Sequence, residues 1–409
     1  MALTPPPAPS QALPPKTSSL SARGENERIR VFLVDDSPVA LVMLMRMLAT
    51  SPEIEVVGAA RSGREALARF ESARPNVICT DYHMPDMDGL ALIQRTMEVF
   101  PRPILVISSV IDPSQREKIF PLLAAGAVDV TAKPGADQPF EQAAAALVQK
   151  IKLLSGVVVI SRRAPAAANI VLRERPPSRS PALSAASDTV SAPTNSGDSA
   201  SKVLWTPASR AGVTGAATRG IRVVAIGAST GGPQALQTIF MRLPTSFPCP
   251  IVCVQHISEG FLAGLVDWLN AQCRVRVKIA DNGEMSSPGT IYFPAENTHL
   301  EINAQGRLSY SHAPPVDGHK PSVTATFDSV ARHFGPAAVG VLLTGMGSDG
   351  AAGLESMRRA GATTIAQDEA SCVVFGMPRQ AILRDAAQMV LPPSEIADFM
   401  LRLTPAVPS

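Results

Sequence analysis

The sequence predicts an α/β protein of two doubly wound, mainly parallel-sheet domains joined by a disordered linker. Two blocks of the chain alternate short apolar runs, typical of buried strands, with amphipathic stretches of helix length. The segments before and between these blocks are rich in Pro, Ala and Ser and show no periodicity. A length of 409 residues leaves room for two domains of about 100 to 200 residues each.

These patterns predict a tail, a domain, a linker and a second domain, in that order. We expect a disordered tail over residues 1–28, a first domain over 29–154, a linker over 155–219 and a second domain over 220–405. Both Pro-rich segments should be mobile and solvated, because they carry too few apolar residues to form a core.

The charge balance gives no reason to expect a nucleic acid or an anionic lipid as a partner. Lys and Arg number 37 against 35 Asp and Glu, so the formal net charge is +2 and no strong field surrounds the protein. The N-terminus lacks an apolar stretch of signal-peptide length, and no run of about 18 apolar residues could span a membrane. We expect a cytoplasmic protein, and a monomer.

The five cysteines are an odd number and lie mostly within apolar, strand-like runs, which favours buried thiols over a disulfide framework. Cys249 and Cys253 have the spacing of half a metal site. No second Cys or His pair follows at zinc spacing, so a core position is the favoured interpretation for both.

The first block contains five strand-like runs separated by helical patterns. The runs are IRVFLVDD (29–36), EVVGAA (55–60), PNVICTD (75–81), PILVISS (103–109) and AVDVTAKP (127–134). Functional residues of a doubly wound sheet gather beyond the carboxyl ends of its strands. At those ends the sequence has Asp35, Asp36, Asp81, Ser108 and Lys133.

Three carboxylates at one sheet edge would repel one another without a divalent cation among them, and a site rich in oxygen ligands suits Mg²⁺. The ammonium of Lys133 and the hydroxyl of Ser108 could then hold a phosphoryl group. Alternatively, the acidic pair Asp35 and Asp36 with Ser37 could simply cap the following helix. Five matched positions at strand ends favour the phosphoryl site.

The second block is also α/β, mainly parallel, with hairpin-like antiparallel pieces in its middle. Its strand-like runs are RVVAIGA (222–228), PIVCVQ (250–255), the irregular GTIYFPAENTHLEI (289–302) and VGVLLTG (339–345). Its helical patterns are GPQALQTIFMRL (232–243), FLAGLVDWLN (261–270), SVTATFDSVARHF (322–334) and AAGLESMRRAG (351–361).

A glycine-rich turn follows the first of these runs and presents Ser229 between Gly227 and Gly231 at the start of a helix. Free amides and the positive end of the helix dipole could stabilise an oxyanion there, or equally cradle a phosphate. A dinucleotide site would have an acid at the end of the second run, whereas this chain has His256. Histidine at that position favours proton transfer.

A nucleophilic serine needs a base, and the base needs an orienting acid. Asp349 is the candidate acid, in another glycine-rich turn where the amide of Met346 could also face an oxyanion. Taken singly, Ser229 and Asp349 could be helix N-caps and His256 a strand-end histidine. Their convergence from three strand ends favours a catalytic triad, and His319 lies in a loop that could line the site.

The acidic pair, the acceptor Asp, the Ser and the Lys-Pro together resemble the receiver domain of two-component response regulators. The resemblance implies that Asp81 accepts a phosphoryl group, and that Asp35 and Asp36 bind Mg²⁺ with Asp81 and the backbone carbonyl of His83. It also implies that Ser108 senses the phosphoryl group and that Lys133 pairs with it.

The whole chain from about 29 to 403 resembles the CheB family of chemotaxis protein-glutamate methylesterases. The motifs that carry the resemblance are GASTGG, QHIS, PPVDGHKPSV, LLTGMGSDGA and AQDEASCVVFGMP. It implies hydrolysis of glutamyl methyl esters, and deamidation of certain glutamines, on methyl-accepting chemoreceptors at the membrane. Ser229 would attack the carbonyl, His256 would take its proton, Asp349 would orient His256, and amides near Thr230 and Met346 would hold the oxyanion. No cofactor is implied for the hydrolysis.

The family resemblance also implies control by the receiver domain. The unphosphorylated receiver would cover the esterase entrance, and phosphorylation by the histidine kinase CheA would weaken that packing. Two positions depart from the family pattern: Thr324 stands where an acid is usual, and Gln380 where Glu is commoner. We expect both to affect receptor specificity more than chemistry.

Two other functions remain open from the sequence. A scaffold could bind methylated or amidated receptors without turnover, and a nucleotide could bind at the glycine turn.

Overall fold

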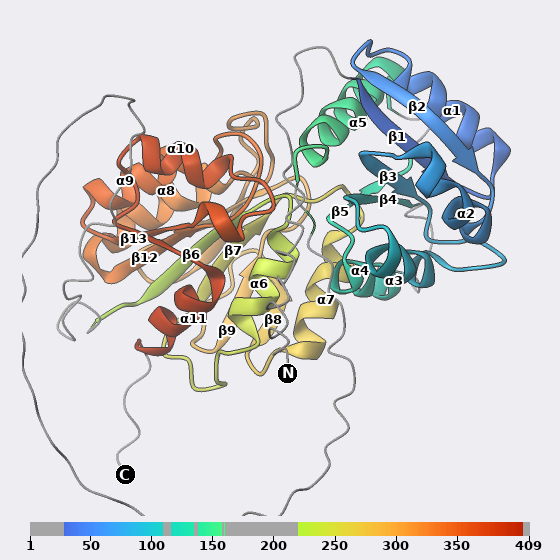
Figure 1. The fold of residues 1–409 in the computed structure, drawn as a ribbon. Helices are drawn as coiled ribbons and strands as arrows, with labels where there is room; N and C mark the ends of the chain where they lie inside the picture. The colour runs from blue at the N-terminus through green and yellow to red at the C-terminus, as the bar shows by residue number, and fades with distance from the viewer. Residues whose placement is uncertain (1–27, 109–115, 135–137, 158, 160–219, 404–409) are drawn as a thin grey trace, which may run out of the picture.

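The computed structural model describes residues 28–108, 116–134, 138–157, 159 and 220–403. Within them the chain forms two α/β units that lie side by side (Figure 1). Nearly all of the predicted tail and most of the predicted linker lie outside the described residues.

The first unit is a parallel sheet of five described strands in the order β2-β1-β3-β4-β5. Its strands are β1 (Ile29–Val34), β2 (Ile54–Ala60), β3 (Val77–Thr80), β4 (Ile104–Ser108) and β5 (Asp129–Ala132). Its helices are α1 (Pro38–Leu48), α2 (Gly63–Ala73), α3 (Gly89–Val99), α4 (Arg116–Ala125) and α5 (Phe140–Leu154). The Ser37, Ser62 and Asp88 side chains cap the first three helices by accepting hydrogen bonds from backbone amides. The first unit is therefore the predicted doubly wound parallel sheet, with the strand order of the flavodoxin-like class.

The second unit is built on a parallel sheet with seven strands among the described residues, in the order β14-β13-β12-β6-β7-β9-β8. The strands are β6 (Val223–Ala228), β7 (Ile251–Gln255), β8 (Arg276–Ile279), β9 (Thr290–Phe293), β12 (Ala338–Leu342), β13 (Thr363–Gln367) and β14 (Met389–Leu391). A separate antiparallel pair is formed by β10 (His299–Ile302) and β11 (Leu308–Ser311). The predicted hairpin in the middle of the domain is therefore β10–β11, whereas β9 joins the parallel sheet.

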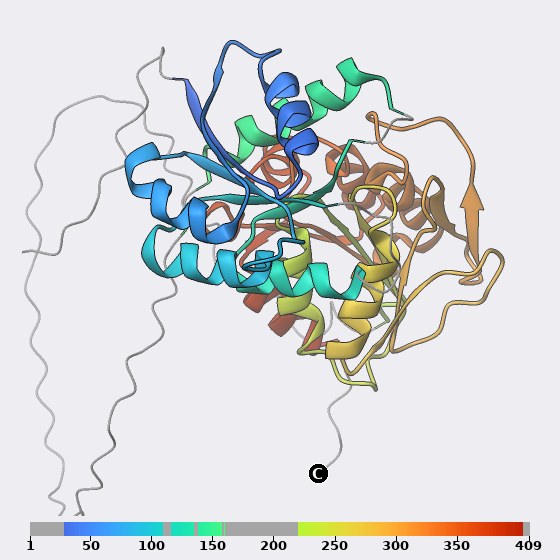
Figure 2. The ribbon, with the colours of Figure 1, turned by 90° about the vertical axis from the view of Figure 1, so that its right-hand side faces the viewer.

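Helices cover both faces of this sheet, as the doubly wound class requires (Figures 1 and 2). They are α6 (Gly232–Phe240), α7 (Leu262–Gln272), α8 (Val323–Phe334), α9 (Ala351–Arg359), α10 (Met377–Leu383) and α11 (Pro393–Leu401), with 3₁₀ turns η2 (Gly335–Ala337) and η3 (Glu369–Ser371). None of the described helices is long and apolar enough to cross a membrane.

The strand order makes β6 the point at which the chain reverses direction across the sheet. From β6 the chain first builds β7 on one side and later returns to place β12 on the other. A crevice between loops forms at such a point, beyond the carboxyl ends of the strands. The loops after β6, β7 and β12 therefore meet, and these loops carry the predicted triad.

The two units contact each other through α4 of the first and α7 of the second. The rings of Phe120 and Trp268 stack there with centroids 5.7 Å apart, and both side chains are buried. Aromatic contacts of this kind contribute beyond the apolar area that they bury. The contact fixes which face of the first unit lies against the second.

Candidate active site and phosphorylation pocket

Ser229 follows β6 directly and lies partly exposed in the turn that leads into α6. Its amide donates a 3.0 Å hydrogen bond to the carbonyl of Thr344, which comes from the loop after β12. The turn depends on glycine, because Gly231 has φ +79° and a Cβ there would lie 2.5 Å from Cβ of Val373. The local sequence thus fixes the serine at a sharp strand-to-helix turn.

Two polar side chains from neighbouring strand ends hold this turn in place. Nε2 of the buried Gln255 donates to the carbonyls of Ser229, at 2.7 Å, and of His256, at 2.8 Å. On the other side, Oγ1 of Thr344 donates to the carbonyl of Thr230 at 3.0 Å. The serine turn is therefore tied to both adjacent strands by side-chain hydrogen bonds.

His256 follows β7, and its amide donates to the carbonyl of Ala228 at 2.9 Å, so it sits beside the residue that precedes Ser229. Its side chain is 10% exposed, and Nε2 lies 2.9 Å from Oδ2 of Asp349. Nδ1 is buried and has no hydrogen-bond partner in the part of the chain that the structure describes. With Nε2–H donated to the carboxylate, Nδ1 carries the free lone pair that a base needs.

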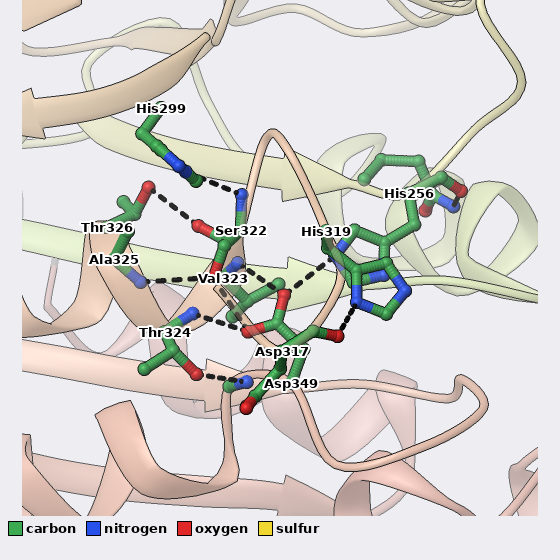
Figure 3. A network of polar contacts seen from close by, with 12 residues as sticks. His256, His299, Asp317, His319, Ser322, Val323, Thr324, Ala325, Thr326 and Asp349 are labelled. Atoms are coloured by element: carbon green, nitrogen blue, oxygen red, sulfur yellow. Dashed lines mark hydrogen bonds and ion pairs between the residues drawn. The ribbon is translucent and has the colours of Figure 1, made fainter. Parts of the chain in front are cut away.

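Asp349 is fully buried and accepts hydrogen bonds on both carboxylate oxygens. Oδ1 accepts from Oγ of Ser322 at 2.8 Å and from the amide of Thr324 at 2.9 Å, while Oδ2 accepts from the amide of Val323 at 2.8 Å and from His256. Three of these donors belong to the N-terminus of α8, whose dipole favours a negative charge (Figure 3).

Burial opposes ionisation of Asp349. The hydrogen bond and electrostatic attraction from His256, together with the hydrogen bond from the amide of Thr324, outweigh burial and hold the pKa of Asp349 well below its usual value. The acid is therefore a carboxylate at neutral pH. It can orient His256 and stabilise the imidazolium that forms when His256 takes a proton.

The residues that support Asp349 were not predicted from the sequence. The amide of Ser322 donates to Nδ1 of His299 at 3.1 Å, and Nε2 of His299 donates to the carbonyl of Pro314 at 3.1 Å. The signal for Ser322 was available, since a serine immediately before a helical pattern is a typical N-cap. Thr324 was expected to bear on specificity, yet its amide contacts the candidate acid.

Thr230 and Met346, the candidate oxyanion residues, both adjoin Ser229. Thr230 follows it in the chain, and Met346 follows Gly345, where a Cβ would lie 2.6 Å from Cβ of Ser229. The two loops therefore pack as closely as glycine allows. Backbone amides at such a junction are suited to receive a developing negative charge.

The strand ends of the first unit form a second polar site. Nζ of Lys133 lies 2.7 Å from an oxygen of Asp35 and 2.7 Å from an oxygen of Asp81, and both carboxylates are almost fully buried. Asp36 joins them, since one carboxylate oxygen from each acid lies within 4.8 Å of the others.

Burial, opposed by Lys133 and reinforced by Asp35, raises the pKa of Asp81. Burial would lower the pKa of Lys133, but its hydrogen bonds with Asp35 and Asp81 outweigh that effect and raise it. One ammonium thus faces more carboxylate charge than it neutralises. Three acids with this excess of negative charge fit a divalent cation with oxygen ligands.

The remaining predicted residues lie around this pocket. Ser108 is buried at the end of β4, and its carbonyl accepts from the amide of Lys133 at 2.9 Å. His83 is exposed two residues after Asp81, and its ring meets that of Tyr82 edge to face.

The first unit reaches the serine turn directly. Oγ1 of Thr230 donates to Oδ2 of Asp129 in β5 at 3.0 Å, and Nε2 of Gln234 in α6 donates to the carbonyl of Ala127 at 3.0 Å. The hydroxyls of Thr131 and Ser258 lie 3.2 Å apart. A covering contact between the two units was expected from the family resemblance, but these residues were not predicted to form it.

Comparison with known proteins gives matches over both units. Residues 31–145 match the response regulator receiver domain family, and residues 224–400 match the CheB methylesterase family. The chain is 39% identical over 380 residues to "Protein-glutamate methylesterase/protein-glutamine glutaminase 1" of Syntrophus aciditrophicus, covering 93% of this chain and 99% of that relative. A similar protein of Methanospirillum hungatei is 38% identical over 378 residues, covering 92% and 98%.

Among solved structures, the CheB methylesterase catalytic domain of Thermotoga maritima is 38% identical to this chain. The matched region covers 44% of this chain and 98% of that domain, with a TM-score of 0.44. Two parallel α/β units with these family matches define a response regulator with an esterase domain as its output. The chain belongs to the CheB methylesterase family.

Proposed function

We propose that this chain is a protein-glutamate methylesterase and protein-glutamine glutaminase whose nucleophile is Ser229 and whose activity is controlled by phosphorylation of Asp81. The observation that carries the catalytic part is the arrangement of His256, which binds the ionised Asp349 through Nε2 while Nδ1 has no hydrogen-bond partner among the described residues. The backbone amide of His256 donates to the carbonyl of Ala228, the residue before Ser229. A base in this state can take the serine proton.

In the first step, Oγ of Ser229 attacks the γ-carbonyl carbon of a glutamyl methyl ester as its proton passes to Nδ1 of His256. The carbonyl oxygen becomes an oxyanion, which the amides of Thr230 and Met346 stabilise. Asp349 stabilises the imidazolium. The C–O bond to methanol then breaks, and His256 returns its proton to the leaving oxygen.

The second step releases the acyl group. His256 takes a proton from water as the water oxygen attacks the acyl carbon, and returns it to Oγ of Ser229 when that bond breaks, leaving glutamate. A glutamine substrate follows the same route with ammonia as the leaving group. Its amide carbonyl needs the same oxyanion contacts, so one site serves both reactions.

Control begins at the acidic pocket of the first unit. Asp81 accepts the phosphoryl group, and Asp35, Asp36 and Asp81 would hold Mg²⁺ together with the His83 carbonyl. When bound, Mg²⁺ neutralises charge on the phosphoryl oxygens. Lys133 pairs with the phosphoryl group and Ser108 contacts it, which rearranges β5 and weakens the contacts of Asp129 and Thr131 with the esterase.

The partners follow from this chemistry. The substrate is a glutamyl side chain of a methyl-accepting chemoreceptor, and the phosphodonor is the histidine kinase CheA. We propose that the protein acts as a cytoplasmic monomer at membrane-bound receptors.

Substitution of the nucleophile tests the proposal. Ser229→Ala should abolish methanol release from methylated receptor membranes and labelling by a serine-directed organophosphorus fluoride. Ser348→Ala changes an exposed serine in the loop of Asp349 and should leave both unchanged. Methanol release by Ser229→Ala at the wild-type rate would exclude Ser229 as the nucleophile.

A further inference from the structure

A second histidine covers one face of the proposed base. The rings of His256 and His319 are nearly parallel, with an interplanar angle of 6° and centroids 4.0 Å apart (Figure 3). Neither the family matches nor the catalytic steps above give His319 a role. Its ring is partly buried, and its contact is with the group that must move a proton.

A tight turn places His319 in this position. Val316 and His319 form an antiparallel bridge, with hydrogen bonds in both directions at 2.9 and 3.1 Å. The two residues between them, Asp317 and Gly318, have φ values of +50° and +77°. Positive φ at both central positions is the type I′ turn that Asp-Gly favours, so the sequence itself specifies the turn.

The hydrogen bonding of His319 defines its protonation state. Nδ1 lies 2.8 Å from the carbonyl oxygen of Asp317, which can only accept, so Nδ1 carries the proton. Burial and the neighbouring His256 lower the pKa of His319, which keeps the ring neutral near pH 7. The neutral ring of His319 therefore stacks on His256. It carries no positive charge that would compete with His256 for the carboxylate of Asp349.

We propose that His319 is a positioning residue for proton transfer: its ring stacks on His256 and holds that imidazole in the plane in which Nε2 meets Asp349 and Nδ1 remains free for Ser229. This inference rests on the proposed function. The hydrogen bond between Nε2 and Asp349 fixes the position of one nitrogen but leaves the ring free to tilt about it. A flat neighbour 4.0 Å away restricts that tilt and excludes water from the covered face.

A metal site is a less suitable interpretation of the same cluster, although His256, His319 and Asp349 each place one ligand atom within 4.8 Å of the others. Ring nitrogens bind metals in the plane of the ring, and two parallel rings direct their lone pairs in separate planes. Both oxygens of Asp349 are already engaged. Stacking explains the geometry without moving any of these groups.

Three variants of the full-length, phosphodonor-treated protein test the proposal. His319→Ala removes the stack, His319→Phe keeps a flat ring without nitrogens, and His319→Leu supplies apolar bulk without a flat face. The matched control is His312→Ala, because His312 is an exposed histidine earlier in the same loop and its backbone carbonyl, not its side chain, contacts Lys320. Melting temperatures show whether each variant is folded.

Two rates are measured for each protein: methanol release, resolved into kcat and KM, and inactivation by a small serine-directed organophosphorus fluoride. We expect His319→Ala and His319→Leu to lower kcat and the inactivation rate constant by about tenfold with KM unchanged. His319→Phe and His312→Ala should stay within about twofold of wild type. The small reagent matters because it reports on the serine without occupying a receptor-binding surface.

Wild-type rates for His319→Ala, equal rates for His319→Leu and His319→Phe, or an effect confined to KM would each overturn the positioning role. If the wild-type protein itself releases no methanol and is not labelled at Ser229, the proposed function fails, and this inference fails with it. The two failures are therefore distinguished by the wild-type measurement.

Discussion

The hydroxyl of Thr230, the residue that follows Ser229, donates a 3.0 Å hydrogen bond to Oδ2 of Asp129 in the other unit. Asp129 begins β5, and Lys133 directly after the same strand pairs with Asp81. One strand of four residues thus joins the acidic pocket of the first unit to the serine turn. This connection gives the proposed control a specific route that mutations can test.

The first prediction concerns this contact. Asp129→Ala removes the acceptor for Thr230, and loss of a hydrogen bond worth about 1 kcal/mol should weaken docking of the receiver unit. We expect methanol release without phosphodonor to rise about fivefold, while the phosphorylated rate stays the same. Glu141→Ala removes an exposed acid from the same unit and should change neither rate. An unchanged basal rate in Asp129→Ala would show that the contact does not restrain the enzyme.

The second prediction concerns Asp349, the acid of the proposed triad. Asp349→Asn keeps the shape of the side chain but removes the charge that stabilises the imidazolium and fixes the tautomer of His256. We expect kcat for methanol release to fall by about 10³- to 10⁴-fold with little change in KM. Asp317→Asn serves as the control, because Asn also tolerates the φ of +50° at that position. A loss below about tenfold in Asp349→Asn would remove Asp349 from the mechanism.

The third prediction follows from the low pKa of Asp349. The unfolded chain binds a proton at this carboxyl near pH 3.8, whereas the folded protein binds it only at lower pH. The unfolded state therefore holds more protons between these two values, and stability falls as pH decreases. Wild type should exceed Asp349→Asn in free energy of unfolding by on the order of 2 kcal/mol at pH 6. That difference should shrink below pH 4 in urea titrations, and a constant difference would contradict the assignment.

The fourth prediction concerns the support of Asp349. Ser322→Ala removes both the cap of α8 and a donor to Oδ1 of Asp349. We expect it to lower the free energy of unfolding by about 1 to 2 kcal/mol and kcat by about tenfold. Ser62→Ala removes a comparable cap from α2 in the first unit. It should lower stability and leave kcat, measured without phosphodonor, unchanged. Equal kcat values for the two variants would mean that Ser322 serves the fold only.

The sequence contained enough to predict a parallel sheet in each unit and the strand-end residues, but not every strand of the second sheet. The residues that follow the strands of a parallel sheet lie at one edge of that sheet. Local patterns alone therefore predicted that Asp35, Asp81 and Lys133 lie close together. In the structure Lys133 forms ion pairs with both acids. The same rule predicted that His256 and Asp349 lie close together. It works because it needs only the position of each strand end.

Contacts made by loops and between units could not be predicted in this way. Asp129 and Thr230 are 101 residues apart, and an acid in a short strand gives no sign of its partner. His319 was expected near the site, but its stacking on His256 depends on how the turn lies against the sheet. The strands β8, β13 and β14 also escaped prediction, and the three residues of β14 form too brief a run to distinguish from a loop.

The most direct test of the central claim measures methanol release from methylated receptor membranes with and without a small-molecule phosphodonor. Wild type should be stimulated by the phosphodonor, Asp81→Asn should keep the basal rate without stimulation, and Ser229→Ala should release no methanol in either condition. A wild-type rate that the phosphodonor leaves unchanged would contradict control through Asp81. Methanol release by Ser229→Ala would contradict the assignment of the nucleophile.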